Sequence, residues 1–270
     1  MKKRGFSDRS QLSEKDPVCT VRILRRCNFR CPSCSTFSGP EGRGAISLTD
    51  FCLAADILAG EGFAGQLNIS GGETTLHPDF GAMLSYASTR LEKARISVFT
   101  NGQWVGQAGW LDILGSLMAG PNVVVRFSLD RQHAEGEVRG RCRQWTEGEI
   151  RASERARIEK ARSFLRACSD MKAQPGVNFD FAFKGSLEEG RAYTRELGEV
   201  PLYLIRFRPF PAERPKEPGF FAVDVDEENR PEVYLTLGHI PAHESFGGLD
   251  TLAAALEINR KAVGKDEGHA

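Results

Sequence analysis

Short apolar runs alternate with longer amphipathic segments along most of this chain. Runs rich in β-branched residues predict strands at 18–24, 66–70, 96–100, 123–129, 177–183 and 202–207. Between them, apolar residues at three- and four-residue steps predict helices at about 48–59, 78–93, 110–119, 150–171 and 187–197. Six alternations of strand and helix are typical of parallel βαβ units with right-handed crossovers.

The ends of the chain depart from this rhythm. Residues 1–16 are polar and carry no period, which predicts a flexible leader before a core at 17–210. After a Pro-rich stretch, residues 211–270 predict a C-terminal extension that covers the core. It contains two further strands, at 220–225 and 233–237, and a final amphipathic helix at about 249–263.

One internal segment also departs from the pattern. Residues 131–148 are polar, contain glycine and show no apolar stripe. We interpret them as an irregular connection that is longer than a usual loop between a strand and a helix.

Composition and charge exclude several classes of protein. The 270 residues hold 36 basic and 36 acidic side chains, whereas a nucleic-acid binder normally has a basic excess. No apolar run reaches the eighteen or so residues of a membrane span. Seven cysteines, with three crowded together, do not form a secreted disulfide framework. We therefore expect a cytoplasmic protein that acts on neither membranes nor nucleic acids.

The three crowded cysteines are the strongest chemical signal. Cys27, Cys31 and Cys34 follow the first predicted strand at spacings of four and three. Three thiolates on one loop can hold three irons of a [4Fe–4S] cluster and leave the fourth iron open to another ligand. The alternative is a non-catalytic structural zinc site. Zinc normally takes four protein ligands, however, and this sequence has no second Cys-x-x-Cys pair.

This C-x3-C-x2-C motif resembles the signature of the radical S-adenosylmethionine (radical SAM) superfamily. The resemblance implies an α/β fold, a partial (β/α)6 TIM-like barrel with a C-terminal β/α extension. It also implies a [4Fe–4S] cluster and S-adenosyl-L-methionine as cofactors. Reductive cleavage of S-adenosylmethionine would yield a 5′-deoxyadenosyl radical that abstracts hydrogen from the substrate.

A second motif ends the second predicted strand. Gly71, Gly72 and Glu73 alone describe only a tight turn with an acidic residue. At this place, the family resemblance implies that they bind the methionine ammonium group of the cofactor. Two glycines permit close approach of the backbone, and a carboxylate suits an ammonium group.

Further site residues follow from the same resemblance. It implies cofactor contacts from Asn101 and Ser128 at the ends of the third and fourth strands, with Asp130 and His133 nearby. Ser33 would contact adenine through its backbone, although the family usually has a bulky residue there. Turn chemistry is the alternative for the residues at the strand ends.

Two single cysteines suggest a further role. Some family members quench the product radical with a cysteine thiol, and Cys142 in the irregular segment is our candidate for that hydrogen donor. Cys168 lies on the apolar stripe of a predicted helix, which indicates a small core residue instead.

The substrate is the least visible part of the sequence. We expect a small biosynthetic molecule, with a peptide-modifying maturase as the alternative. The resemblance also implies an external electron donor such as flavodoxin or ferredoxin.

Overall fold

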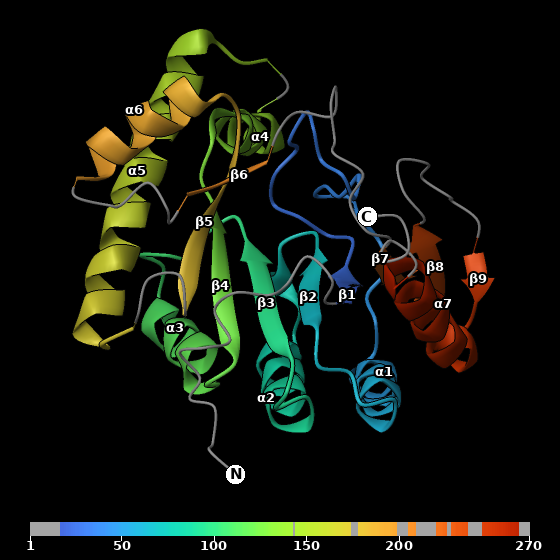
Figure 1. Cartoon of the computed structure of the whole chain (residues 1–270). Helices are drawn as coiled ribbons and strands as arrows, with labels where there is room; N and C mark the ends of the chain where they lie inside the picture. The colour runs from blue at the N-terminus through green and yellow to red at the C-terminus, as the bar shows by residue number, and fades with distance from the viewer. Residues whose placement is uncertain are drawn as a thin grey trace.

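The computed structural model describes residues 17–142, 144–173, 178–198, 205–208, 220–225, 228–236 and 245–264. Strands and helices alternate through the first two thirds of the chain (Figure 1). The strands are β1 (Val18–Leu24), β2 (Gln66–Gly71), β3 (Arg95–Thr100), β4 (Val123–Ser128), β5 (Phe179–Lys184) and β6 (Ile205–Arg208). The helices are α1 (Leu48–Gly60), α2 (Phe80–Arg90), α3 (Trp110–Ala119), α4 (Arg131–Arg141), α5 (Glu147–Asp170) and α6 (Leu187–Leu197).

The six strands β1 to β6 are parallel neighbours in the order of the sequence, in a sheet that does not close. This arrangement confirms the predicted partial (β/α)6 barrel. The bounds of β1, α3 and α6 agree with the predicted ones, and other elements begin or end within a few residues of them. Ser47 caps α1 at its start, because its side chain accepts a hydrogen bond from the Asp50 backbone N–H at 3.0 Å.

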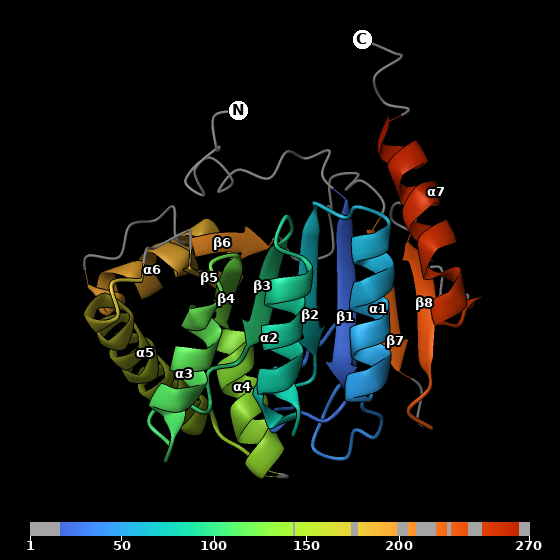
Figure 2. The same cartoon turned by 90° about the horizontal axis from the view of Figure 1, so that it is seen from below.

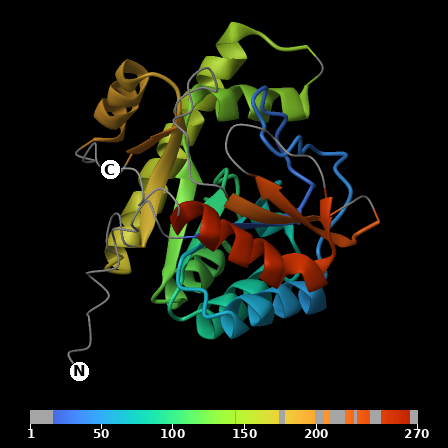
Figure 3. The ribbon, with the colours of Figure 1, turned by 45° about the vertical axis from the view of Figure 1, so that its right-hand side comes forward.

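The extra strands predicted after the core continue the same sheet. Strand β7 (Phe220–Val225) pairs parallel with β1, and β8 (Pro231–Thr236) and β9 (Ser245–Gly247) follow in antiparallel order. Helix α7 (Leu252–Gly264), after a short 3-10 turn, packs beside β7, β8 and α1 (Figure 3). The predicted leader and the Pro-rich stretch lie outside the described residues, so the three-part division of the chain stays a prediction.

One prediction about the core is wrong. Most of the segment predicted to be irregular is helix α4, which begins after Asp130 and ends before Cys142. The Asp130 side chain accepts the backbone N–H of His133 at 2.9 Å and so caps the helix. The sequence shows no apolar stripe that would predict this helix, because its buried face is made partly of glycine and packs on a loop.

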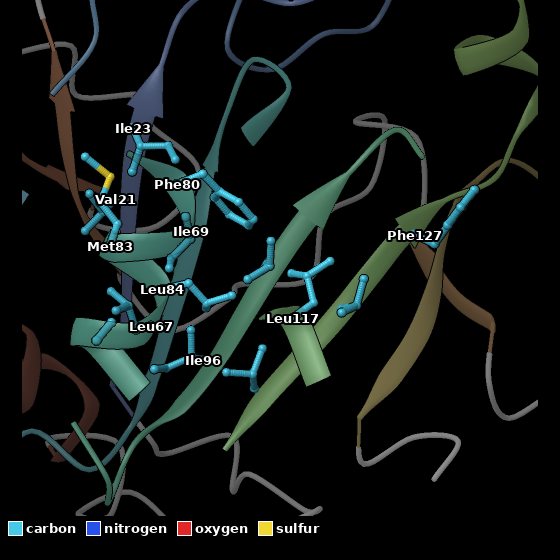
Figure 4. Packing of buried hydrophobic residues seen from close by; sticks show 14 of the residues in the cluster. Val21, Ile23, Leu67, Ile69, Phe80, Met83, Leu84, Ile96, Leu117 and Phe127 are labelled. Carbon is cyan, nitrogen blue, oxygen red and sulfur yellow. The ribbon is translucent and has the colours of Figure 1, made fainter. Parts of the chain in front are cut away.

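The hydrophobic core lies on one face of the sheet. Alternate residues of strands β1 to β5 pack against helices α1, α2, α3 and α5, and Figure 2 shows α1, α2 and α3 lying along this face. Figure 4 shows the interdigitated side chains, among them Val21, Ile23, Leu67, Ile69, Phe80, Met83, Leu84, Ile96, Leu117 and Phe127. Because side chains of a strand alternate between the two faces, the other residues of these strands point away from the helices.

Candidate functional site

The cysteine loop lies at the carboxyl ends of the parallel strands, directly after β1. The Cys27 backbone N–H donates to the Gly39 carbonyl at 2.9 Å, and the Arg30 N–H donates to the Gly136 carbonyl at 2.8 Å. The loop is thus anchored on one side to its own return segment and on the other side to α4. Carboxyl ends of strands are where α/β barrels place their chemistry.

The three thiols of this loop are free and partly buried. Burial, followed by the mutual influence of the thiols, raises the pKa of Cys31 to about 12. Burial likewise raises the pKa of Cys27 to about 12, although the Phe29 N–H donates to its sulfur at 3.4 Å and opposes the shift. Thiols must lose their protons to bind metal, so loading the site releases protons and favours neutral or alkaline pH.

The donor set fits an iron–sulfur cluster. Three thiolates on one loop are the soft ligands that such clusters select. Among the described residues, no three His, Cys, Asp or Glu side chains gather closely enough to hold one metal ion. Ligands of a cluster need not meet that condition, because each thiolate binds its own iron.

Helix α4 packs on the loop through glycine. A methyl group at Gly136 would lie 2.5 Å from the Cys31 sulfur, and one at Gly140 would lie 2.5 Å from the Asn28 carbonyl oxygen. The two glycines are one turn apart, so the helix backbone itself forms one wall of the loop. Any side chain at these two positions would push the cysteines away from α4.

The Gly71–Gly72–Glu73 turn packs against the same loop from β2. Gly71 has a φ of 127°, a conformation that favours glycine, and a side chain on Gly72 would collide with the Arg26 carbonyl. The Glu73 N–H donates to the Arg26 carbonyl at 3.1 Å. The two motifs singled out in the sequence are therefore in direct backbone contact.

The Glu73 side chain is only 2% exposed and ties two strand ends together. One carboxylate oxygen accepts the hydroxyls of Thr75 and Thr100, both at 2.7 Å, and the other accepts the Asn101 N–H at 2.6 Å. Burial raises the pKa of Glu73, and these hydrogen bonds oppose the rise. The carboxylate therefore holds the end of β3 in place, and its predicted role toward an ammonium group stays a prediction.

Other predicted contacts surround the loop. The Asn101 amide donates to the Asn28 side chain at 2.8 Å and to the Cys27 sulfur at 3.8 Å. Ser33 donates through its hydroxyl to Gln132, at the start of α4. The Ser128 carbonyl accepts a hydrogen bond from Arg157. The structure brings these residues to one edge of the sheet, and their contacts with a cofactor stay predictions.

The remaining predicted residues, Asp130, His133, Cys142 and Cys168, differ in their surroundings. Asp130 is 1% exposed, and its carboxylate accepts a hydrogen bond from the Nδ1 ring nitrogen of His133 at 2.8 Å. These two predicted residues are therefore hydrogen-bonded to each other. Cys142 follows the last residue of α4 and is exposed, which leaves its role as hydrogen donor a prediction. Cys168 is fully buried in the apolar core, as its place on the helix stripe indicates.

The face of the sheet that points away from the helices is polar. The Asn68 amide donates to the Thr20 hydroxyl at 3.1 Å, and the Gln66 amide donates to Asn68 at 2.6 Å. Arg126 on β4 donates to Gln66 at 3.3 Å and forms an ion pair with Asp180 on β5 at 3.8 Å. This polar row crosses strands β1, β2, β4 and β5. Parallel strands buried on both faces usually read as continuous apolar runs, so such a row is unusual.

Neither Arg157 nor this polar row was predicted from the sequence. Arg157 lies on the apolar stripe of α5, four residues before Ala161 and seven after Ile150, and all three are buried. An arginine on such a stripe was a signal that could have drawn attention to it. The polar row could have been predicted from polar residues at alternate positions of strands that were expected to be buried.

Comparison with known families agrees with the geometry of the loop. Residues 21–179, more than half of the chain, match the family described as the Radical SAM superfamily. The chain belongs to the radical SAM superfamily. Membership confirms the predicted cofactors, a [4Fe–4S] cluster and S-adenosylmethionine, and the prediction of a radical SAM enzyme.

Named relatives are similar to part of the chain. AlbA of Bacillus subtilis (strain 168), an antilisterial bacteriocin subtilosin biosynthesis protein, is 32% identical over 43% of this chain and 25% of its own. An S-adenosylmethionine-dependent nucleotide dehydratase of Selenomonas ruminantium is 30% identical over 30% of this chain and 28% of its own. The matched segment thus spans about a quarter of each of these relatives.

Among solved structures, Streptococcus suis SuiB bound to S-adenosylmethionine is similar at a TM-score of 0.47 and 11% identity. That match covers 87% of this chain and 64% of SuiB.

Within the described part of the chain, no helix is long and apolar enough to cross a membrane.

Proposed function

We propose that this radical SAM enzyme abstracts hydrogen from a small, polar biosynthetic molecule bound against the polar face of its sheet. The observation that carries the proposal is the polar row from Thr20 to Asp180, which is linked by hydrogen bonds and one ion pair. Buried side-chain amides and an arginine are costly to keep without hydrogen-bond partners. A polar ligand on this face would add hydrogen-bond partners to this row.

Different residues at the carboxyl edge of the sheet would have different roles in this reaction. Cys27, Cys31 and Cys34 would hold the cluster, and Gly71 to Glu73 would let the cofactor approach the backbone. When bound, the two cofactors supply a 5′-deoxyadenosyl radical that can abstract hydrogen from an unreactive C–H bond. The protein positions the substrate and excludes water.

A peptide is the second candidate substrate. The similarity to AlbA, whose name refers to biosynthesis of a bacteriocin, favours it. The similarity to a nucleotide dehydratase favours a small molecule by the same kind of argument. Because each match spans about a quarter of the relative, the polar row decides our order of preference.

An external electron donor such as flavodoxin or ferredoxin is part of this proposal. Cys31 and Cys34 line an open surface depression of about 470 Å³, together with Arg30 and Arg139. A carrier could approach the bound cluster from this side. We place the reaction in the cytoplasm, where the thiols stay reduced.

Anaerobic reconstitution with iron and sulfide tests the proposal. We expect about four irons per chain, and 5′-deoxyadenosine when dithionite and S-adenosylmethionine are added. Small polar metabolites and short peptides labelled with deuterium are then added in separate reactions. The class of compound that transfers deuterium to deoxyadenosine is the substrate class. One tightly bound zinc and no deoxyadenosine would contradict the enzymatic function and support the structural zinc site.

A further inference from the structure

A buried arginine lies directly against the cysteine loop. Arg157, on α5, is 1% exposed and is the largest fully buried side chain among the described residues. Its guanidinium carbon lies 5.2 Å from the centre of the Phe29 ring. Phe29 is itself 1% exposed and stands in the chain between Cys27 and Cys31. The cation therefore packs on the part of the loop that joins two cysteines.

The guanidinium has an unused donor in this position. One terminal nitrogen donates to the Ser128 carbonyl at 2.5 Å, whereas the Nε of Arg157 is buried and has no hydrogen-bond partner in the described part of the chain. Burial lowers the pKa of Arg157, and the charges of Glu137 and Asp130 oppose that shift. Arginine keeps its proton even so, because its pKa in water is above 12.

The charge of Arg157 reaches the cysteines. Burial is the main cause of the raised pKa of Cys31, and Arg157 is the cation that acts against it. Helix α4 also packs on this loop, since a side chain at Gly136 would collide with Cys31. A cluster held by three thiolates would bring negative charge to the place where this cation is buried.

We propose that Arg157 is a positioning residue of the cluster site, a permanent buried cation stacked on Phe29 that raises the reduction potential of the bound cluster. The inference rests on the proposed function, because it needs a cluster on Cys27, Cys31 and Cys34. Reduction adds one negative charge to the cluster. A nearby positive charge stabilises the reduced form more than the oxidised form, and low local polarity strengthens the effect.

The experiment measures the potential in the absence of S-adenosylmethionine. Wild type, Arg157→Met and Arg157→Lys are reconstituted, and the reduced cluster is followed by electron paramagnetic resonance during a redox titration. For Arg157→Met we expect about a tenfold lower ratio of reduced to oxidised cluster at a fixed potential, which is about 59 mV for one electron. Arg157→Lys retains the charge and is expected to stay near the wild-type value.

Two further variants serve as controls. Arg151→Met removes an exposed arginine of the same helix that pairs with Glu147, and we expect no shift. Asp130→Asn removes a buried negative charge that acts on Cys31 but keeps a side chain able to cap α4, and we expect a shift to higher potential. This opposite shift keeps the proposal testable if Arg157→Met fails to fold.

Several outcomes would overturn the inference. One is a fully loaded Arg157→Met protein with the wild-type potential, and another is an equal shift in Arg157→Lys, which would indicate packing and not charge. An unchanged or lower potential in Asp130→Asn would also contradict it. Weaker binding of S-adenosylmethionine with no change in potential would make Arg157 a cofactor ligand instead. A wild-type protein that takes up no cluster would refute the proposed function itself.

Discussion

The two faces of the parallel sheet are built from opposite kinds of side chain, although the same strands supply both. Toward the helices, valine, isoleucine, leucine and phenylalanine form one continuous core. Away from them, Asn68, Gln66, Arg126 and Asp180 hold each other by hydrogen bonds and an ion pair. Burial of apolar surface stabilises the first face, while the second face costs free energy unless its groups are paired. Under our proposal, stability and substrate binding are divided between neighbouring residues of the same strands.

A second polar region surrounds the cysteine loop at the carboxyl edge of the strands. There, Glu73, Asp130 and Arg157 are each at most 2% exposed, and each bonds to a backbone or side-chain group of a neighbouring element. Perturbed and buried ionisable groups cluster at functional sites more than elsewhere. The following predictions use the contrast between this region and the apolar core, in order of expected size.

Removing one cluster ligand should abolish function but not the fold. For Cys31→Ala we expect loss of the bound cluster and deoxyadenosine formation below about one hundredth of wild type, because an iron loses its thiolate. Iron content, visible absorbance and deoxyadenosine are measured on the reconstituted proteins. Cys52→Ala, on α1, is the control and should retain all three. A Cys31→Ala protein with about four irons would contradict the assigned ligand set.

Truncating a side chain of the apolar core should lower stability. Phe164 is fully buried, and its ring centre lies 5.3 Å from that of Phe127 and 5.6 Å from that of Phe179. Phe164→Ala should lower the free energy of unfolding by about 3–5 kcal/mol, which denaturant titration measures. Leu111→Ala, at a side chain that is 56% exposed, should change it by less than about 0.5 kcal/mol. Equal losses in both variants would show that this cluster is not the core.

A substitution in the polar row should affect substrate binding more than cofactor cleavage. Asn68→Leu keeps the branched shape of the side chain but removes the amide that forms hydrogen bonds with Thr20 and Gln66, so we expect KM for the substrate to rise about tenfold. Formation of deoxyadenosine without substrate should stay near wild type. Val98→Ala, on the opposite face, destabilises the protein without touching the row and should leave KM unchanged. An unchanged KM in Asn68→Leu would place the substrate elsewhere.

The smallest effect concerns pH. Burial raises the pKa of Glu73 above 4.5, so the folded protein holds this proton more tightly than the unfolded chain does. Stability from this group is fully present at low pH and is lost as the pH rises from the unfolded pKa through the folded one. The stability of Glu73→Gln relative to wild type should therefore increase above about pH 4.5 in the metal-free protein. Denaturant titrations at several pH values measure this difference, and a constant difference would contradict the raised pKa.

Much of this molecule followed from local sequence. β-branched runs determined the strands, three- and four-residue apolar steps determined most helices, and Ser47 determined where α1 begins. Cysteine spacing predicted the cluster ligands, because the three thiols lie on one short loop whatever the rest of the chain does. These features depend on interactions between residues close in sequence, which is why periodicity and motif could find them.

Tertiary structure alone decided the rest. Helix α4 has no apolar stripe and depends on Asp130 at its start and on the fit of Gly136 against Cys31, more than a hundred residues away in the chain. Burial of Arg157 depends on Phe29 in the same way. The pairing of β7 with β1, and the meeting of polar residues from four strands, likewise require the sheet to be assembled. Contacts between distant segments leave no period in the sequence, so the surroundings of the cysteine loop emerged only from the fold.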